Sequence, residues 1–139
     1  VHVGENTAEK CKIKVGSAIE TDIPEEPYVL IGKDVVTSNP RKVTITPNEI
    51  REALKEPVDA VVEAVRRALE KTPTELVTDI YEEGIYMAGG GSLLRGLAKR
   101  IEKETKIACH VTDNPLLAIV KGSGIALENL KEYKQVFIN

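Results

Sequence analysis

The chain has 139 residues and a mass of 15.2 kDa, the size of one ordinary domain or of a piece of a larger one. Hydrophobic residues make up 42% and charged residues 29%, which allows a packed core and excludes wholesale disorder. Lys and Arg total 19 against 22 Asp and Glu, and Trp is absent. The sequence therefore lacks the cationic excess and the aromatic platform typical of a nucleic-acid-binding protein.

Cysteine usage and hydropathy bound the cellular setting. Cys11 and Cys109 are the only cysteines, which is too few for a disulfide scaffold and favours a reducing, cytoplasmic environment. No apolar run approaches the roughly 20 residues of a membrane helix, and no secretion-signal pattern opens the sequence. We therefore expect neither a membrane span nor a secretion signal.

The first third of the chain predicts a helix followed by an antiparallel hairpin. Asn6-Thr7-Ala8-Glu9 has the pattern of a capping box, so a helix is expected over 7–15, ending near Gly16. The acidic, proline-containing residues 21–27 are typical of a loop. The hairpin is predicted from β-like runs at 28–31, 35–36 and 42–46 around a turn signal at 38–40.

A long amphipathic helix is predicted next. Thr46-Pro47-Asn48-Glu49 is a second capping box with proline at the first helical position. Apolar residues then recur at steps of three and four between Ile50 and Leu69, which predicts a helix to about Lys71. Pro57 lies inside this pattern and is expected to kink the helix or to break it in two.

The remainder predicts a short helix and then a parallel α/β unit. Thr72-Pro73-Thr74-Glu75 is a third capping box, with Gly84 ending the helix that it opens. Beyond it, strands are predicted at 85–88 and 107–111, and helices at 93–101 and 113–127 with Asp113 as N-cap. Strands and helices that alternate across short loops are typical of a parallel sheet.

The sharpest functional feature is a glycine triplet where the strand at 85–88 ends. Backbone without Cβ at Gly89, Gly90, Gly91 and the following Ser92 could lie flat against a nucleotide, with helix-start N–H groups facing a phosphate. It is no dinucleotide fingerprint, because Leu94 stands where the third glycine belongs, and no Gly-Lys-Ser/Thr of a P-loop follows. A tight strand-to-helix turn that binds nothing also explains the glycines.

Other candidate groups are weaker. Glu9 and Lys12 share a helical face and could contact a ribose hydroxyl and a base, but a solvated charge pair explains them as well. Cys109 and His110 are adjacent on a strand and point to opposite faces, so they form no catalytic dyad. The glycines within 121–124 predict close helix packing against a neighbour. Nucleophile and acid–base patterns are lacking, so a free-standing enzyme has little support.

Taken together, several motifs resemble one family. They are GENTAEKCK at 4–12, NEIREAL at 48–54, EKTP at 70–73 and GIYMAGGGSLLRGL at 84–97, with further similarity at 113–116 and 121–124. Their order closely resembles the MreB family of bacterial actin-like, rod-shape-determining proteins, over nearly the whole chain. The resemblance implies an α/β fold of the actin/Hsp70 type, in which two lobes close on ATP or ADP with magnesium.

Within that fold the chain resembles most of the second lobe. Residues 1–16 would contribute a helix to the nucleotide cleft, 17–83 a small subdomain with the hairpin and long helix, and 84–139 the α/β part of the large subdomain. By the resemblance, two sets of residues line one cofactor site: Glu9, Lys10, Cys11 and Lys12 on the adenosine, and Gly89, Gly90, Gly91 and Ser92 on the ribose and phosphate side.

The resemblance also implies a cellular role. Family members polymerise with ATP into filaments at the inner face of the cell membrane and control cell shape and wall synthesis. Implied partners are further copies of the protein and membrane-linked morphogenesis proteins such as RodZ, with membrane association through parts outside this chain. A nucleotide-independent interaction module, using the acidic loop at 20–26 and the hairpin, is the alternative.

The chain departs from the family pattern in two respects. The two Asp-x-Gly phosphate loops and the acidic catalytic residue of the family have no counterpart here, so no residue is assigned a hydrolytic role. The β-meander of the family is reduced to two strands, which leaves a sheet edge that needs covering or pairing.

Overall fold

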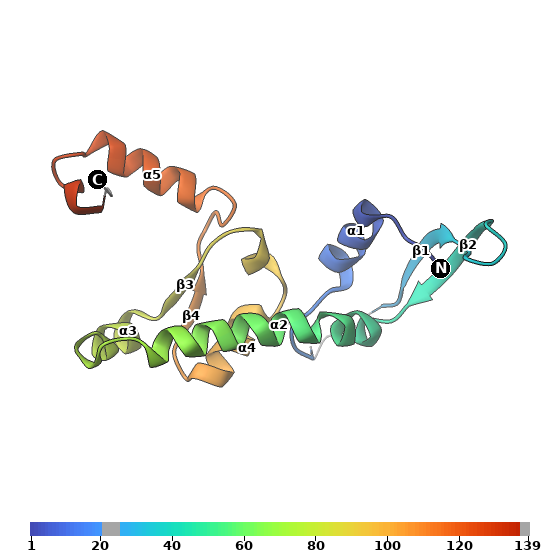
Figure 1. Ribbon diagram of the computed structural model, residues 1–139, viewed down its shortest axis with the longest axis horizontal. Helices are drawn as coiled ribbons and strands as arrows, with labels where there is room; N and C mark the ends of the chain where they lie inside the picture. Colours follow the sequence, from blue (N-terminus) through green and yellow to red (C-terminus); the bar gives the residue numbers. More distant parts are fainter. Residues whose placement is uncertain (21–25, 137–139) are drawn as a thin grey trace.

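A long helix, α2, runs along the longest axis of the molecule, with the β1–β2 hairpin beyond one end and α3 at the other (Figure 1). The computed structural model describes residues 1–20 and 26–136, so most of the acidic loop predicted at 21–27 falls outside the described residues. No helix in the described ranges has the length and apolar composition needed to cross a membrane. The elements are α1 (Glu5–Val15), β1 (Tyr28–Lys33), β2 (Pro40–Ile45), α2 (Pro47–Glu70), η1 (Thr74–Leu76), α3 (Val77–Glu83), β3 (Ile85–Met87), η2 (Gly90–Leu93), α4 (Leu97–Thr105), β4 (Cys109–Val111), α5 (Ala118–Glu128) and η3 (Lys134–Val136).

Helix α1 ends where predicted but begins earlier. Its N-cap is Gly4, whose carbonyl oxygen accepts from the N–H groups of Thr7 and Ala8 at 2.9 and 3.0 Å. The capping box predicted at Asn6 is therefore wrong, because Asn6 already lies in the first helical turn. Gly16 ends the helix, and its N–H donates to the carbonyl oxygen of Lys12 at 2.8 Å.

The predicted hairpin is confirmed. Strands β1 and β2 pair antiparallel, with Tyr28 opposite Ile45 and Lys33 opposite Pro40. Val35 and Val36, predicted as strand, lie instead in the connecting turn. On the other side of β1, His2 and Lys33 exchange two backbone hydrogen bonds of 2.7 and 2.8 Å, so the N-terminal segment covers part of the edge that the two-stranded sheet leaves open.

Helix α2 is a single helix of 24 residues, about 36 Å long at 1.5 Å per residue. Its capping box forms as predicted, since Thr46 Oγ1 accepts from the N–H of Glu49 and Glu49 Oε2 accepts from the N–H of Thr46. Pro57 does not break it. Both Pro57 and Ala53, whose carbonyl loses its helical partner, are exposed, so water replaces the missing hydrogen bond.

The third predicted capping box does not form. The Thr72 hydroxyl donates back to the carbonyl oxygen of Ala68 at 2.9 Å, and neither η1 nor α3 has a side-chain cap. Gly84 ends α3 as predicted, with φ of +81°, in a conformation that side-chain-bearing residues rarely adopt.

The parallel unit of the last third is confirmed, although its helices begin late. β3 and β4 pair parallel, with Ile85 opposite Cys109, and α4 connects them along the chain. Leu93 and Leu94, predicted as helix, belong to η2 and its cap. The N-cap of α5 is Leu117, so the cap predicted at Asp113 is wrong.

Helix α5 differs from its prediction in packing. None of its residues, all of which the structure describes, is buried. A Cβ added at Gly122 or Gly124 would meet no atom within 4 Å, so the predicted close helix packing is wrong. In Figure 1 the helix stands away from the α2 layer.

Two apolar clusters hold the rest together, and α2 contributes to both. The larger consists of Val58 and Val62 from α2 with Leu97 and Ile101 from α4, packed against the parallel strands. The smaller consists of Cys11, Val15 and Leu30, packed against the hairpin and the start of α2. Helix α2 thus connects the two clusters. The subdomain boundaries expected at 16/17 and 83/84 stay predictions.

Candidate functional site

The glycine triplet forms a turn that closes on itself. Gly89 has φ of +83° and ψ of 168°, and its N–H donates to the carbonyl oxygen of Pro115 at 2.8 Å. Its own carbonyl oxygen accepts from the N–H of Ser92 at 3.2 Å and from the Ser92 hydroxyl at 2.7 Å. Ser92 is only 6% exposed. Its hydroxyl therefore supports the turn from inside, and contact of Ser92 with a cofactor stays a prediction.

The space above the turn is open. A Cβ added at Gly89 or Gly91 would meet nothing within 4 Å, and one added at Gly90 would make an ordinary 3.5 Å contact with Leu116. Only Gly89 of the three has a positive φ. The turn conformation thus explains why residue 89 is a glycine. It does not require glycine at positions 90 and 91, as expected if a flat ligand approaches the backbone of Gly90 and Gly91.

Helix α1 places its four predicted site residues differently. Glu9 Oε2 and Lys12 Nζ form a 2.6 Å ion pair with side chains 55% and 44% exposed, and Lys10 is exposed. Cys11 is 2% exposed and lies in the smaller apolar cluster, where burial raises the pKa of its thiol. The Cys11 side chain therefore faces the core in this arrangement, and a role of Cys11 in cofactor binding stays a prediction.

Arg95 links the segment after the glycine turn to the end of α1. Its Nε donates to the carbonyl oxygen of Gly16 at 3.1 Å, and its Nη2 donates to that of Lys14 at 3.0 Å. Its own carbonyl oxygen accepts from the N–H of Ala18 at 2.8 Å. The guanidinium also lies at the negative end of the α1 dipole. The segment with Glu9 to Lys12 and the segment with Gly89 to Ser92 thus meet about one helical turn beyond Lys12.

Sequence reasoning did not single out Arg95 as a link between the two predicted residue sets. It lies 79 positions after its acceptor Gly16, and nothing in the local pattern separates it from any other surface arginine. Its place just after the glycine turn is the only signal that could have singled it out.

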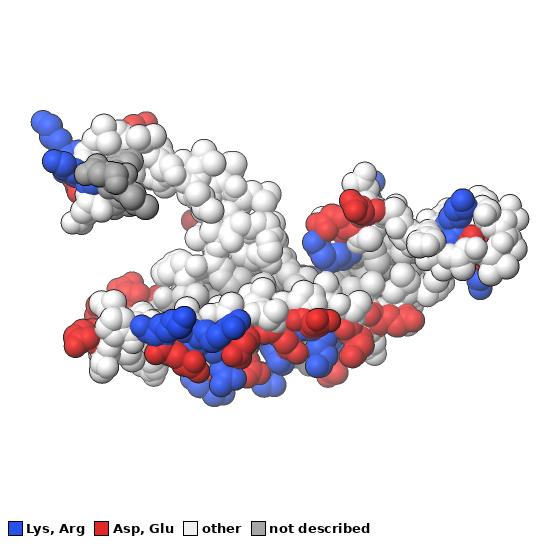
Figure 2. Space-filling view, viewed as in Figure 1, with Lys and Arg blue, Asp and Glu red and all other residues white. Residues whose placement is uncertain are grey.

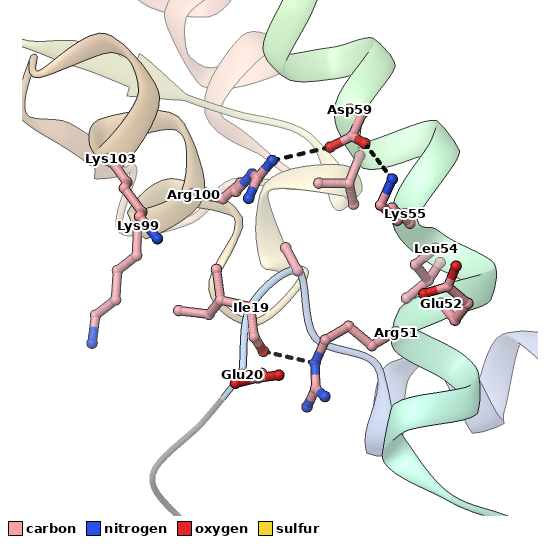
Figure 3. Close-up of a pocket in the computed structure, with 12 residues that line it drawn as sticks. Ile19, Glu20, Arg51, Glu52, Leu54, Lys55, Asp59, Lys99, Arg100 and Lys103 are labelled. Carbon is pink, nitrogen blue, oxygen red and sulfur yellow. Dashed lines mark hydrogen bonds and ion pairs between the residues drawn. The ribbon is translucent and has the colours of Figure 1, made fainter.

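A separate cavity of about 530 Å³ lies between α2, α4 and residues 18–20 (Figure 3). Its charged groups bind one another, since Asp59 contacts Arg100 at 3.2 Å and Lys55 at 3.4 Å. Arg51 Nε donates to the carbonyl oxygen of Ile19 at 3.1 Å. None of the residues predicted to bind a cofactor lines this cavity.

Groups that could hold a metal ion are not assembled in the described ranges. Over residues 1–20 and 26–136, no three His, Cys, Asp or Glu side chains gather where they could hold a metal ion. Burial, and secondarily the charge of Glu102, raises the pKa of the Cys109 thiol, which disfavours a reactive thiolate. His110 is exposed and its ring lies 5.2 Å from that of Tyr86.

Comparison with known proteins identifies the family. The family model described as MreB/Mbl protein matches residues 1–135. The chain belongs to the MreB/Mbl family. It is 39% identical over 128 residues to the cell shape-determining protein Mbl of Bacillus subtilis (strain 168), covering 92% of this chain and 38% of that relative. It is 44% identical over 126 residues to the cell shape-determining protein MreB of Escherichia coli (strain K12), covering 91% and 36%.

Solved structures of the MreB/Mbl family confirm the actin-like α/β fold. The structure of MreB5 of Spiroplasma citri bound to ADP superposes with a TM-score of 0.88 at 28% identity, over 97% of this chain and 41% of that one. The structure of the same protein bound to AMPPNP gives 0.87 over 97% and 40%. The chain thus spans about two fifths of the length of the relatives that it matches.

Proposed function

We propose that this chain is the C-terminal part of an actin-like protein that binds ATP and polymerises into membrane-associated filaments controlling cell shape and cell-wall synthesis. Membership of the MreB/Mbl family and the ADP-bound and AMPPNP-bound structural neighbours support this proposal. The observation that carries it is the glycine turn, in which Gly90 and Gly91 leave open space that the fold itself does not require.

In this proposal the chain supplies one wall of a nucleotide cleft. The backbone of Gly90 and Gly91 faces the ribose and phosphates, while the N–H of Gly89 holds the turn through its bond to Pro115. Glu9 accepts from a ribose hydroxyl, and the Lys12 stem packs on the base. Arg95 keeps the two segments in register through its bonds to the end of α1. When bound, the nucleotide supplies the contacts that set the angle between two lobes.

Magnesium would be held mainly by the phosphates and by residues outside this chain. The described residues contain no acidic cluster that could bind it. Because the Asp-x-Gly phosphate loops and the acidic catalytic residue of the family have no counterpart here, we assign this chain no hydrolytic residue, and ATP turnover would require groups from the other lobe.

Calorimetry of the isolated chain tests the single-wall prediction. We expect weak ATP binding and no turnover, because the opposite wall with its phosphate loops is missing. Micromolar affinity together with measurable ATP hydrolysis by this chain alone would contradict it.

Substitution of Glu9 and Gly90 tests the site within a full-length parent protein. Glu9→Ala with Gly90→Val should weaken nucleotide binding and raise the nucleotide concentration needed for assembly. A Cβ at Gly90 meets only Leu116 at an ordinary 3.5 Å, and circular dichroism of the variant checks that the fold accepts the rest of the valine side chain. Gly122→Val is the matched control, because a Cβ there meets nothing within 4 Å and the position is remote in sequence from the turn.

The second candidate is an interaction module that needs no nucleotide. The exposed apolar turn of the hairpin favours it, with Val35 and Val36 63% and 87% exposed. The acidic loop that this alternative also uses lies largely outside the described residues. Assembly that is unchanged when Glu9→Ala and Gly90→Val abolish nucleotide binding would support this candidate and contradict the first.

The proposed partners and location follow from the filament proposal. They are further copies of the protein and membrane-linked morphogenesis proteins such as RodZ, at the inner face of the cell membrane. Membrane attachment would use parts outside this chain. Flotation of this chain with lipid vesicles checks the last point, and the expected result is that it stays in the unbound fraction.

A further inference from the structure

The cavity between α2, α4 and residues 18–20 has the size of a small-molecule site. Its volume is about 530 Å³, within the range of about 300–1,000 Å³ that is typical of such sites. Part of its wall is apolar, because Val58 belongs to the larger apolar cluster and Ala18 and Leu54 pack against that cluster. The cavity therefore offers both room and an apolar surface to a ligand other than the proposed nucleotide.

The charged residues that line this cavity give it a net positive charge on an acidic chain. The cations are Arg51, Lys55, Lys99, Arg100 and Lys103, and the acids are Glu20, Glu52 and Asp59. Five cations against three acids give +2, whereas the whole chain carries −3. Along α2 as a whole, acidic and basic side chains are interspersed (Figure 2). The local excess of cations attracts a small anion.

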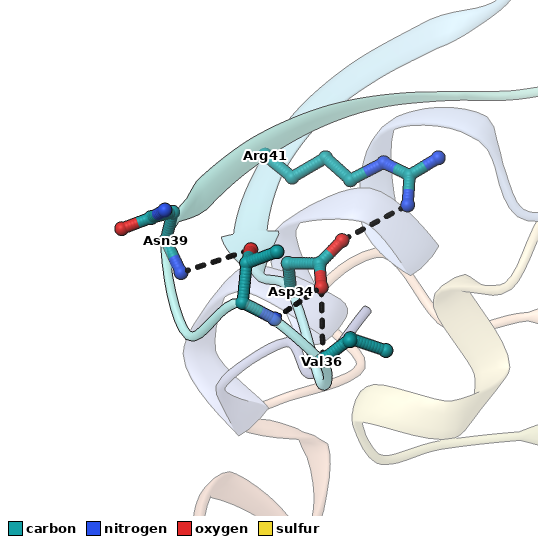
Figure 4. A network of polar contacts seen from close by, with 5 residues as sticks. Asp34, Val36, Asn39 and Arg41 are labelled. Carbon is teal, nitrogen blue, oxygen red and sulfur yellow. Dashed lines mark hydrogen bonds and ion pairs between the residues drawn. The ribbon is translucent and has the colours of Figure 1, made fainter.

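Two of the cations stand apart from the ion pairs of Asp59. Lys99 and Lys103 lie one turn apart on α4, both are exposed, and neither has an ion-pair partner among the described residues. The carboxylate of Asp34, by contrast, is held by two backbone N–H groups and by Arg41 (Figure 4). Like charges four residues apart on a helix repel each other. An anion bound beside the two lysines would relieve that repulsion.

The acids that line the cavity lie mainly away from these lysines. Figure 3 shows Glu20 and Glu52 toward Arg51, whereas Lys99 and Lys103 extend from α4 on the other side. The α4 side is therefore the part of the cavity where an anionic group meets the least repulsion from the lining acids.

We propose that this cavity binds a small organic phosphate monoester. The phosphate faces Lys99 and Lys103, and a short apolar group packs against Ala18, Leu54 and Val58. A phosphate monoester carries about −1.5 to −2 at pH 7. This charge matches the +2 of the cavity better than the single charge of a carboxylate does. No residue of the proposed nucleotide site lines the cavity, so either proposal can fail without the other.

Isothermal titration calorimetry of this chain with hexyl phosphate tests the ligand class. Hexyl phosphate should bind, and hexanoate and inorganic phosphate should bind at least about tenfold more weakly, because each lacks part of the charge or the apolar group. Hexanol should not bind. Added salt should weaken the binding of hexyl phosphate, since salt screens exposed charges. Hexyl phosphate that does not bind, or that binds no better than inorganic phosphate, would overturn the proposal.

Variants that remove charge locate the site. Lys99→Ala with Lys103→Ala should weaken the binding of hexyl phosphate by at least about tenfold, because two charged donors are lost. Both lysines are exposed, so folding should persist. Lys121→Ala with Lys131→Ala removes two exposed lysines elsewhere and is the matched control, which should bind like the unaltered chain. Binding that survives in the Lys99 and Lys103 double variant but is lost in Gly90→Val would place the probe in the nucleotide site and overturn the proposal.

Flotation with vesicles that contain phosphatidic acid separates a soluble ester from a lipid, because this lipid carries the same phosphate monoester. The chain should stay in the unbound fraction, since acyl chains that remain in the bilayer cannot reach the apolar wall of the cavity. Flotation that Lys99→Ala with Lys103→Ala abolishes would overturn the soluble ligand and assign the phosphate to a lipid headgroup.

Discussion

Gly89, Gly90 and Gly91 are chemically identical, but the turn requires only the first to be glycine. The φ of +83° and ψ of 168° at Gly89 lie in a region that is almost closed to residues with a Cβ. The other two have no positive φ and have free space above them. A structural role and a candidate binding role thus fall on neighbouring residues of one motif, and substitution can separate them.

Alanine at Gly89 should destabilise the fold by about 1–3 kcal/mol, the usual cost of that backbone conformation. Alanine at Gly91 should change the free energy of unfolding by less than about 0.5 kcal/mol, because its methyl group would meet no neighbouring atom and the backbone there has no positive φ. Urea denaturation of the two variants checks this difference. Equal losses of stability would contradict the assignment.

Asp34 makes the stability of the hairpin depend on pH. Hydrogen bonds from the Thr37 and Val36 amides and the Arg41 guanidinium lower the pKa of its carboxyl well below the ordinary value. A lowered folded-state pKa stabilises the fold above the unfolded value of about 3.9, and this contribution is lost as pH falls further. Thermal melts from pH 6 to pH 2.5 should therefore show declining stability.

Asp34→Asn should reduce that pH dependence. A smaller part should remain, because hydrogen bonds from the Thr46 amide and hydroxyl lower the pKa of Glu49 in the same direction. A variant whose melting temperature falls with pH as steeply as that of the unaltered chain would contradict the role given to Asp34.

Three segments carry the capping-box pattern, but only the one at Thr46 forms. Thr46 follows β2 and has extended backbone, with φ of −82° and ψ of 150°, so its hydroxyl faces the new helix. Thr72 follows α2 closely and bonds back to it through Ala68. At Asn6 the helix has already begun, because Gly4 provides the cap. The preceding element thus decides whether a capping pattern is used.

Thr46→Ala should cost about 1 kcal/mol of stability, within the range of 0.5–2 measured for lost N-caps. Thr72→Ala is the matched control and should cost less than about 0.5 kcal/mol, since no cap is lost. Chemical denaturation compares the two. A cost at Thr72 equal to that at Thr46 would show that the third box operates after all.

Across the molecule, two apolar clusters are joined by α2 and by the bonds of Arg95. The clusters share no buried residue. The link through Arg95 therefore decides how the α1 end of the candidate site is held relative to the glycine turn. Helix α5 adds to neither cluster, and its exposed apolar side chains include Ile119, Val120 and Ile125.

Arg95→Ala should lower the free energy of unfolding by about 1–2 kcal/mol, because two hydrogen bonds from a charged group are lost. Hydrogen exchange should rise over residues 14–18 more than elsewhere. Arg66→Ala, an exposed arginine on α2, is the control and should leave both measurements unchanged. Unaltered exchange at the end of α1 in Arg95→Ala would remove Arg95 from the site.

The fold class and much of the element order could be read from the amino-acid sequence, because they depend on short-range patterns. The alternation at 42–46, the helical repeat from Ile50 to Leu69 and the strand–glycine–helix order after Gly84 each report a local preference and an apolar face. The resemblance carried by the same segments led to the MreB/Mbl family. It named the glycine turn and α1 as parts of one site.

The tertiary structure alone decided which of these residues are exposed and which face the core. Cys11 shares its helix with Glu9 and Lys12, but its side is covered by the hairpin. Arg95 meets Gly16 across 79 positions. No local pattern encodes such relations, because packing brings distant segments together and determines which surfaces remain exposed.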